Sequence, residues 1–487
     1  MALYNDMREF LRALEEKGLL KRVKAEVSAD LEIPEILDRL VKKNGPAVIF
    51  ENVKGFSGGM PVAGNLYGTR ERVAMGLGVE EEEFKKIGEF IAYLQRPKPP
   101  EGLWDAIKKI PFFGSILTLG PKTVRSGPCQ DVVLKEDADL SKLPILKCWP
   151  NDAGPLITWP MVITQAPDGG PYNVGVYRMQ YLDKKRAVIR WLKQRGGAKH
   201  HSLWEKEKKA MPVAVAIGCE PATTIAAVTP LPEDISEFHF AGVLRKKAIE
   251  LVNCKTIPLL KVPSTAEIVL EGEIHFGETA REGPFADHTG YYNSAENFPV
   301  FHLKAITHRQ NPLYLATITG RPPKEDAVIG TVLNNLYLPT LKLNFPEVVD
   351  FSLPMEAVSY RIAVVSIKKE YPGHAKRIMM GLWGILKQFL YVKYIIVVDD
   401  DIDVNNWADI IWAISTRVDP KRDILMIEDT PIDYLDFSSP KEGLGSKLGM
   451  DATAKIPPEV TRKWGEKIEM DKSVIELVTG RWREYGF

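Results

Sequence analysis

The spacing of apolar and polar residues divides the chain into three stretches. Over residues 1–121 helix and strand patterns alternate. "DMREFLRALEEKG" and "IPEILDRLVKK" have apolar residues at helical spacing, and each is followed by a short apolar run, "LLKRV" or "PAVIFENV". This alternation predicts an N-terminal α/β segment. A third helix, "VEEEEFKKIGEFIAYLQRP", and a proline-rich connector, "KPPEGLWDAIKKIPFFG", are expected to complete it.

Residues 122–322 show a different pattern. Short β-rich runs such as "MPVAVAIG" and "AEIVLEGEIHF" are divided by Gly, Pro and Asp turns, which predicts a barrel or sandwich with few helices. Over residues 323–487 the alternation returns, because "GHAKRIMMGLWGILKQFLYVKYIIVVDDDIDV" indicates a helix, a buried strand and an acidic loop. We therefore predict a mixture of α+β and α/β parts. The chain is expected to end in a packed helix with basic and aromatic residues.

Composition narrows the class of protein. The 487 residues exceed what one core needs, and 64 Lys and Arg balance 64 Asp and Glu, so charge gives no case for a nucleic-acid partner. No apolar run reaches the roughly 18 residues of a membrane span, and the amphipathic start is not a signal peptide. The four cysteines form no Cys-x-x-Cys pair. These features predict a cytoplasmic protein with reduced thiols.

The segment "YNVGVYRMQYLDKKRAVIRWLKQRGG" is predicted to be a hairpin. Asn173 and Arg178 would lie on one strand that turns near Asp183, and Arg190 would return on the next. One interpretation is an edge hairpin with solvated arginines. The other is a wall that binds phosphate or carboxylate, since the planar guanidinium pairs with two oxygens at once.

Other polar groups also admit two interpretations. Glu237, in "EDISEFHFAG", suits either a solvated helix start or, with the Asn173 carbonyl, an oxygen ligand set for Mg²⁺ or Mn²⁺. His200 and His201 are expected to be inert. The acidic run "DDDIDV" is expected to close a strand and cap a helix.

Two acids lie five residues apart in "REGPFADHTGYYN". The glycine and proline between Glu282 and Asp287 stiffen the loop, as a proton-transferring group requires. A carboxyl near aromatic walls would act as an acid, whereas one beside an arginine would stay ionised. Spacing alone equally allows a turn with two solvent-facing acids.

A resemblance covers the chain from its first helix to about residue 465. The ordered motifs "NVGVYR", "RWLKQRGG", "PSTAEIVLEG", "EGPFADHTGYYN", "GRPPKEDAVIG", "GHAKRIMMGLWG" and "IDYLDFSSPKEGLGSKLGMDAT" resemble the UbiD family, whose decarboxylases use prenylated FMN. The resemblance implies three parts: an N-terminal α/β segment (1–121), a β-rich split-barrel flavin-binding domain (122–322) and a C-terminal α/β oligomerisation domain (323–487). It also implies a homo-oligomer, from dimer to hexamer.

The resemblance implies site residues. Glu282, Arg178 and Asp287 would be catalytic, with Glu282 as proton donor. Asn173 and Glu237 would bind Mn²⁺ or Mg²⁺, with K⁺ nearby in some members. The residues implied to contact the cofactor are Val176, Tyr177, Arg178, Arg190, Trp191, Leu192, Arg195, Gly196 and Lys387.

The resemblance also implies a reaction. The substrate would be a small aromatic carboxylic acid, foremost 4-hydroxy-3-polyprenylbenzoate, decarboxylated to 2-polyprenylphenol in ubiquinone biosynthesis, with another hydroxyarene or an α,β-unsaturated acid as the alternative. A flavin prenyltransferase would supply the cofactor, and a polyprenyl substrate would bring the protein into peripheral contact with the inner membrane surface.

Two departures from the family pattern, and two rival functions, remain. The segment around "RGGAKHH" is shortened, so no third metal ligand is placed, and the second acid is Asp where related enzymes have Glu. One rival function is a non-catalytic protein that binds flavin or a cation, but such a protein would not need the trio Arg178, Glu282 and Asp287. The other is a metal-dependent hydrolase, which would need a His-rich ligand cluster that the sequence does not show.

Overall fold

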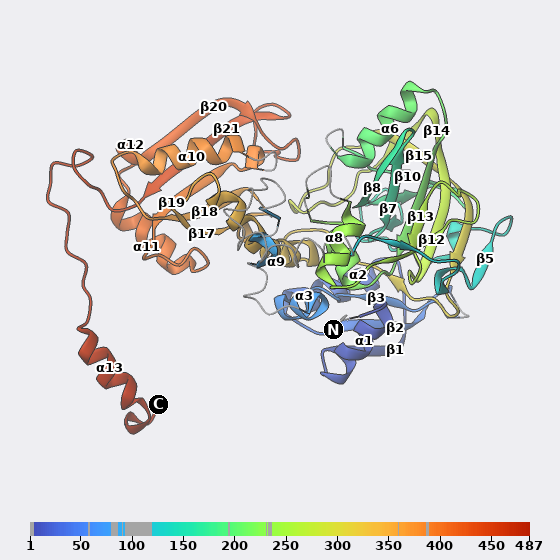
Figure 1. Ribbon diagram of the computed structural model, residues 1–487, viewed down its shortest axis with the longest axis horizontal. Helices are drawn as coiled ribbons and strands as arrows, with labels where there is room; N and C mark the ends of the chain where they lie inside the picture. The colour runs from blue at the N-terminus through green and yellow to red at the C-terminus, as the bar shows by residue number, and fades with distance from the viewer. Residues whose placement is uncertain are drawn as a thin grey trace, which may run out of the picture.

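The computed structural model describes residues 4–56, 59–78, 86–89, 91–92, 119–192, 195–229, 231, 236–358, 360–385 and 389–487. Figure 1 shows the N-terminal and central strands grouped on one side, the C-terminal strands on the other, and a long tail leading to the last helix. The expected third helix and proline-rich connector lie largely outside the described residues.

The N-terminal part is a small sheet covered by helices. Its elements are α1 (Met7–Glu16), β1 (Leu20–Val27), α2 (Glu32–Lys42), β2 (Ala47–Val53), β3 (Val62–Gly64) and α3 (Arg70–Leu77). The sheet order is β1-β2-β3-β16, in which β16 (Tyr314–Leu315) arrives from the far end of the central region. Asp6 caps α1 by accepting from the Glu9 amide, and the helix buries Phe10, Leu11 and Leu14. The predicted helices and strands of this part are confirmed as far as Val53.

The central part is built on one large sheet. Its strands follow the order β6-β9-β10-β15-β14-β11-β7-β8, with β5 also paired to β15, and within the described strands no pairing joins β8 to β6. The sheet is therefore open. The strands are β5 (Val132–Leu134), β6 (Leu156–Ile157), β7 (Met161–Ala166), β8 (Gly169–Val176), β9 (Met179–Tyr181), β10 (Arg186–Ile189), β11 (Met211–Ile217), β14 (Ile268–Glu282) and β15 (Glu296–His308).

Smaller elements lie around this sheet. They are α6 (Gly196–Lys206), α7 (Pro221–Ala226), α8 (Glu237–Leu244) and the three strands of a second sheet, β4 (Lys122–Thr123), β12 (Glu250–Asn253) and β13 (Lys261–Pro263). Short 3₁₀ turns occur at Pro128–Gln130 and Leu140–Lys142. The few helices among many strands confirm the β-rich character predicted from the sequence.

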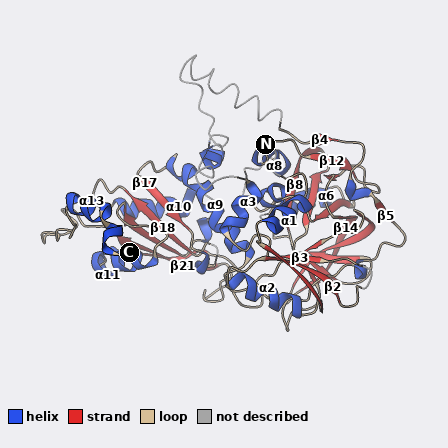
Figure 2. Cartoon of the chain, turned by 90° about the horizontal axis from the view of Figure 1, so that it is seen from below, coloured by secondary structure: helices blue, strands red, loops and turns tan. Residues whose placement is uncertain are grey.

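A long helix leads to the C-terminal part. Figure 2 shows α9 (Glu325–Lys342) between the two groups of strands. The C-terminal sheet has the order β17-β18-β19-β21-β20 and a parallel centre, with apolar clusters on its two faces. Its elements are β17 (Val348–Ser352), β18 (Ile362–Ile367), α10 (His374–Ile385), β19 (Tyr394–Asp399), α11 (Trp407–Arg417), α12 (Pro420–Asp423), β20 (Ile424–Pro431) and β21 (Leu444–Ala452), with 3₁₀ turns at Met355–Ala357 and Phe389–Tyr391. The mixed fold class is thus confirmed.

The last helix differs from its prediction. Only α13 (Lys472–Gly480) and a 3₁₀ turn at Trp482–Tyr485 are helical, and no residue of α13 is buried. The expectation of a packed terminal helix is wrong for the single chain, because the tail carries α13 away from the body (Figure 1). Ile475, Leu477 and Trp482 are each about half exposed. None of the described helices is long and apolar enough to cross a membrane.

The four cysteines are free and buried. Burial raises the pKa of Cys129 to about 12 and also raises the pKa of Cys148, Cys219 and Cys254. Their thiols are therefore protonated and shielded, which agrees with the prediction of reduced cysteines.

Candidate active site

Arg178 lies in the short break between β8 and β9, so the predicted continuous strand is interrupted at Tyr177 and Arg178. The break turns the guanidinium toward the end of β14. Its Nε donates to Oε1 of Glu282 at 2.7 Å and its Nη2 to Oε2 at 3.2 Å. The two side chains thus make the two-point pairing for which an arginine is suited, although 104 residues separate them.

A second arginine contacts the same carboxylate. Arg190, just past β10, donates from Nη1 to Oε2 of Glu282 at 2.8 Å. Burial lowers the pKa of Arg190, but the charge of Glu282 and the contacts with Glu282 and Tyr434 together outweigh burial, and the pKa lies above its usual range. Glu282 is fully buried between two cations, and each of its carboxylate oxygens is paired with an arginine.

Arg190 also links the central and C-terminal parts. Its Nη2 donates to the hydroxyl of Tyr434 at 2.8 Å and to Glu296 at 3.1 Å. The guanidinium lies 4.9 Å from the ring centroid of Phe298 and 5.7 Å from that of Tyr434. The C-terminal part therefore contributes directly to the surroundings of Glu282.

Buried hydrogen bonds hold the loop from Glu282 to Asp287. The Gly283 amide donates to Oε1 of Gln180 at 2.9 Å, and the Ala286 amide donates to Oδ1 of Asp152 at 3.0 Å. Gly283 has a φ of +90°, which favours glycine. Asn293 closes the loop, because its Oδ1 accepts from Arg178 at 2.8 Å and from the Phe285 amide at 3.3 Å. The stiffness predicted for this loop is confirmed.

Asp287 lies beside Arg178, but the shortest hydrogen bonds of Arg178 go to Glu282 and Asn293. Its Oδ2 is 3.8 Å from Nη1 of Arg178, and its Oδ1 is 2.5 Å from Nδ1 of His288. Burial would raise the pKa of Asp287, but pairing with His288 and the nearby arginines holds it below the usual range. For His288, burial acts in the opposite direction and lowers the pKa. The hydrogen bond to Asp287 and the charge of its carboxylate outweigh burial, so the pKa of His288 is raised. The pair can carry a proton next to Arg178.

A second polar group forms around Asn173, on β8. The amide of the next residue, Val174, donates to Oε2 of Glu237 at 3.0 Å, which places Glu237 beside the strand at the first turn of α8. A Cβ on Gly196 would meet Oδ1 of Asn173 at 1.9 Å, so any larger residue there would displace the Asn173 side chain. The N-terminus of α6 thus lies against Asn173. A first-turn amide there, that of Gly197, already donates to the Tyr177 hydroxyl at 3.4 Å, and such helix-start amides can bind an anion.

Glu237 has no cationic partner at hydrogen-bond distance among the described residues. Burial raises its pKa to about 7, because only backbone amides compensate the charge. A buried carboxylate of this kind, on a helix that lies against the strand of Asn173, is a fitting ligand for a hard divalent cation. The solvated interpretation of Glu237 is therefore the weaker one.

Most of the remaining residues expected to contact a cofactor lie nearby. The rings of Tyr177 and Trp191 meet edge to face at 6.2 Å, and a Cβ on Gly197 would meet the Trp191 indole nitrogen at 2.6 Å. Arg195 immediately precedes α6 and is exposed. Val176 and Leu192 are half-buried at the ends of their segments. Lys387 lies outside the described residues.

The two histidines and the acidic run take structural partners. His200 Nδ1 lies 2.9 Å from the Thr164 hydroxyl, and His201 lies 3.9 Å from Glu205, as expected for side chains with no part in catalysis. Asp399 and Asp401 pair with Arg417, while Asn406 caps α11. The acidic run is therefore structural, although the helix cap is a different residue.

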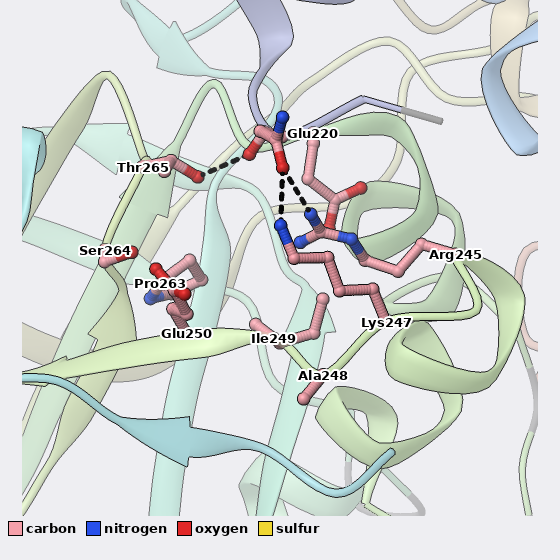
Figure 3. A pocket seen from close by; sticks show the side chains of 10 residues that line it. Glu220, Arg245, Lys247, Ala248, Ile249, Glu250, Pro263, Ser264 and Thr265 are labelled. Carbon is pink, nitrogen blue, oxygen red and sulfur yellow. Dashed lines mark hydrogen bonds and ion pairs between the residues drawn. The ribbon is translucent and has the colours of Figure 1, made fainter. Parts of the chain in front are cut away.

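A separate polar pocket lies elsewhere. Figure 3 shows it between α8, β12 and β13, with Glu220, Arg245 and Lys247 among its lining. Lys247 and Arg245 both donate to Oδ1 of Asn5, at 2.9 and 3.5 Å. Neither Arg178 nor Glu282 belongs to its described lining, so it is not part of the candidate active site.

Sequence reasoning missed three residues of the site. Asn293, Gln180 and Tyr434 each make a side-chain hydrogen bond to the group around Glu282, yet none belongs to a charged motif. The motifs "GYYN" and "IDYLDF" contain Asn293 and Tyr434, but their spacing gives no sign that they reach Arg178 and Arg190.

The chain matches three family models in order. They are described as the N-terminal, Rift-related and C-terminal domains of 3-octaprenyl-4-hydroxybenzoate carboxy-lyase and match residues 11–91, 122–322 and 327–452.

Solved structures extend the similarity over nearly the whole chain. The vanillic acid decarboxylase of Sedimentibacter hydroxybenzoicus in closed form is 29% identical, with a TM-score of 0.84 over 100% of this chain and 99% of that one. The UbiD-class enzyme HmfF of Pelotomaculum thermopropionicum, in complex with FMN, is 30% identical, with a TM-score of 0.81 over 97% of this chain and 99% of that one. An evolved dimeric form of HmfF in complex with prFMN is 29% identical, with a TM-score of 0.78 over 96% and 97%.

Proposed function

The chain belongs to the UbiD family of carboxy-lyases, and from this premise we propose that it decarboxylates an aromatic acid with prenylated FMN as its cofactor. The observation that carries the proposal is the pairing of Arg178 with the buried Glu282, flanked by Arg190 and Asp287. A protein that only binds flavin would not need two arginines gathered around the two carboxylates of one stiff loop. The solved relatives that bind FMN and prFMN support the choice of cofactor.

The residues around Asn173 fit the phosphate end of such a cofactor. The N-terminus of α6 would bind the phosphate, and Asn173 and Glu237 would hold Mn²⁺ or Mg²⁺ against it, with K⁺ as a further candidate nearby. The buried carboxylate of Glu237 supports this, because a cation would compensate its charge. Tyr177, Trp191 and Arg190 would line the flavin side.

Decarboxylation requires stabilisation of the charge left on the ring and a proton for the same carbon. When bound, prenylated FMN supplies the electron sink. Arg178 orients the substrate carboxylate and holds Glu282 in place. Glu282 delivers the proton to the ring carbon, and the Asp287–His288 pair restores it from the solvent side. The anionic substrate would compete with Glu282 for Arg178, so its arrival would loosen the pairing that holds Glu282 and free this side chain to act on the substrate.

We propose 4-hydroxy-3-polyprenylbenzoate as the first substrate to test, with release of a 2-polyprenylphenol in ubiquinone biosynthesis. The description of the matching family models supports this choice. The similarity to vanillic acid decarboxylase supports the alternative, a hydroxybenzoate without a prenyl chain. The exposed apolar residues of α13 support a homo-oligomer.

A Glu282→Gln variant tests the proposal. Full-length protein is co-expressed with a flavin prenyltransferase and assayed with the prenylated and plain hydroxybenzoates. The variant should keep the flavin absorbance of the wild type but lose decarboxylation and exchange with labelled CO₂, because only the proton donor is removed. A fully active variant would show that Glu282 is not the donor.

A second variant separates binding from chemistry. Asn173→Ala should lower the flavin content, because the cation would lose a ligand. An unchanged flavin content would show that Asn173 does not hold a cation against the cofactor phosphate. If the wild-type protein binds no prenylated FMN, the proposed function fails as a whole.

A further inference from the structure

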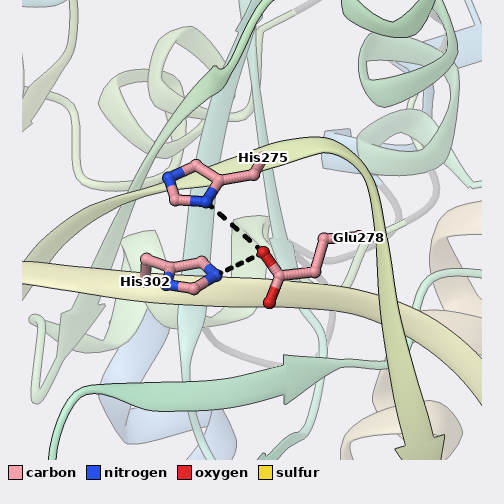
Figure 4. A group of neighbouring side chains, drawn as sticks. All are labelled: His275, Glu278 and His302. Carbon is pink, nitrogen blue, oxygen red and sulfur yellow. Dashed lines mark hydrogen bonds and ion pairs between the residues drawn. The ribbon is translucent and has the colours of Figure 1, made fainter.

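Two histidines and a carboxylate converge on the central sheet, away from the residues discussed above. His275 and Glu278 belong to β14 and His302 to β15, and one ligand atom from each lies within 4.8 Å of the other two. Figure 4 shows both imidazoles facing one oxygen of Glu278. This cluster corrects the sequence-based view that the chain lacks a His-rich ligand group, because the histidines are 27 positions apart in the sequence.

An irregularity in β14 creates the cluster. The ladder between β14 and β15 shifts register between Glu271 and Gly272, and again between the pairs Ile274–Phe301 and Thr279–Pro299. Gly277 lies in this second irregularity and has a φ of +70°, as a glycine in a bulge can adopt. Glu278 is thereby brought back toward His275 and toward His302 on the neighbouring strand.

The distances suit one bound metal ion. His302 Nε2 lies 2.8 Å and His275 Nδ1 lies 3.3 Å from Oε2 of Glu278. Zinc binds imidazole nitrogen and carboxylate oxygen at about 2.0–2.2 Å, so two ligand atoms of a tetrahedral site lie roughly 3.3–3.5 Å apart. If the Glu278 carboxylate moved by a few tenths of an ångström away from His302, the two ligand atoms would reach the separation that a zinc ion requires.

A neighbouring carboxylate orients one of the ligands. His275 turns Nδ1 to Glu278, and its Nε2 lies 3.1 Å from Oε1 of Glu273, which in turn pairs with Lys304. A carboxylate on the far nitrogen of a ligating histidine fixes the tautomer and strengthens the ligand. A chance surface contact does not require this second partner.

The two imidazoles also lie nearly parallel. Their ring centroids are 4.1 Å apart with an interplanar angle of 17°. Two charged imidazolium rings would repel each other at this distance, whereas neutral rings that share a cation would not. All three side chains are partly exposed, from 25% for His302 to 45% for His275, so an ion and a water molecule can reach them.

We propose that His275, Glu278 and His302 form a zinc site that clamps the bulge of β14 to β15, with water in the fourth position. The site is independent of the proposed decarboxylase. Its nitrogen-rich ligands select a borderline transition metal such as Zn²⁺, whereas the oxygen ligands Asn173 and Glu237 select Mg²⁺ or Mn²⁺. From the bulge, β14 continues directly to Glu282, so the clamp would steady the strand that presents this residue.

Zinc content tests the site directly. Full-length protein is stripped with a chelator, reloaded with Zn²⁺, passed through a desalting column and analysed by mass spectrometry of the metal. The wild type should retain one zinc ion per chain, and His302→Ala and His275→Ala should lose it. Reloading with Co²⁺ should give the visible absorption of a low-coordinate site in the wild type alone.

Two control variants decide where the ion binds. His308→Ala removes another histidine of β15, and Glu237→Gln removes the other candidate metal ligand; both should retain zinc. Loss of zinc from Glu237→Gln together with retention in His302→Ala would overturn the proposal, as would a wild type that retains none. If His302→Ala does not fold, Glu278→Gln provides the same test. Hydrogen exchange over residues 272–282 should slow on zinc binding in the wild type only.

Discussion

At the scale of single residues, the burial of Glu237 has a measurable consequence. The pKa is raised from 4.5 to about 7, so the folded state binds the proton more tightly than the unfolded state. The stabilisation from this group is fully present below about pH 4.5 and is lost as the pH rises through about 7. The loss is at most about 3–4 kcal/mol, since one pKa unit corresponds to about 1.4 kcal/mol.

We predict that the wild type loses stability with rising pH and that Glu237→Gln does not. Without metal, the thermal midpoint of the wild type should fall relative to that of the variant between about pH 5 and about pH 8, because only the wild type must hold a buried charge. Mn²⁺ at the higher pH should restore the wild type and leave the variant unchanged. An exposed acid replaced in the same way, Glu136→Gln, should show neither effect. A pH-independent difference between wild type and Glu237→Gln would contradict the prediction.

At the scale of elements, the bulge of β14 depends on one backbone angle. No atom of the described residues lies within 4 Å of the Cβ position of Gly277, so a side chain would fit there, but the φ of +70° is unfavourable for β-branched residues. The conformation of this residue, rather than the space around it, decides which substitutions are accepted.

We predict that Gly277→Val lowers the stability by about 1–2 kcal/mol, whereas Gly277→Asn, whose residue type tolerates positive φ, costs much less. Differential scanning calorimetry of both variants without metal measures the difference. In the presence of Zn²⁺, Gly277→Val should also gain less stability than the wild type, since Glu278 is displaced. Equal midpoints for the two variants would show that the bulge does not depend on this angle.

The elements differ in how far sequence predicts them. Local periodicity is sufficient to predict α1, β1, α2 and β2. The apolar residues that these elements bury lie close together in the sequence, at the spacing of a helix or a strand. It could not predict that β16 joins the N-terminal sheet, or that β14 shifts register, since both follow from pairing between distant segments. The site shows the same division: Glu282 and Asp287 stand out as charges on a stiff loop, whereas Asn293 and Gln180 gain their importance only through tertiary contacts.

At the scale of the whole molecule, one hydrogen bond joins the C-terminal part to the carboxylate of the site. Tyr434, after β20, accepts from Arg190, and Arg190 donates to Glu282. A hydrogen bond to a charged group contributes about 1.5–3 kcal/mol, so the position of the C-terminal part affects how strongly Arg190 holds Glu282.

We predict that Tyr434→Phe keeps the fold and the flavin but slows decarboxylation by roughly tenfold, which corresponds to about 1.4 kcal/mol in the barrier. Arg190 would lose one acceptor and pair more strongly with Glu282, which would then be less free to deliver a proton to the substrate. The rate under substrate saturation is the measurement, and Tyr371→Phe, on an exposed ring far from Arg190 in the sequence, is the matched control. A rate equal to that of the wild type would show that this contact does not reach the chemistry.

The burial of all four cysteines has a practical consequence. A thiol-specific reagent finds no accessible sulfur on the folded chain, so introduced cysteines can carry spectroscopic labels without first removing the native ones. Tyr291 and Phe437 offer a suitable pair of positions, because both side chains are more than half exposed and their rings meet at 6.1 Å between the central and C-terminal parts. A fluorophore and a quencher at these two positions would report, in real time, whether the two halves of the enzyme separate during turnover.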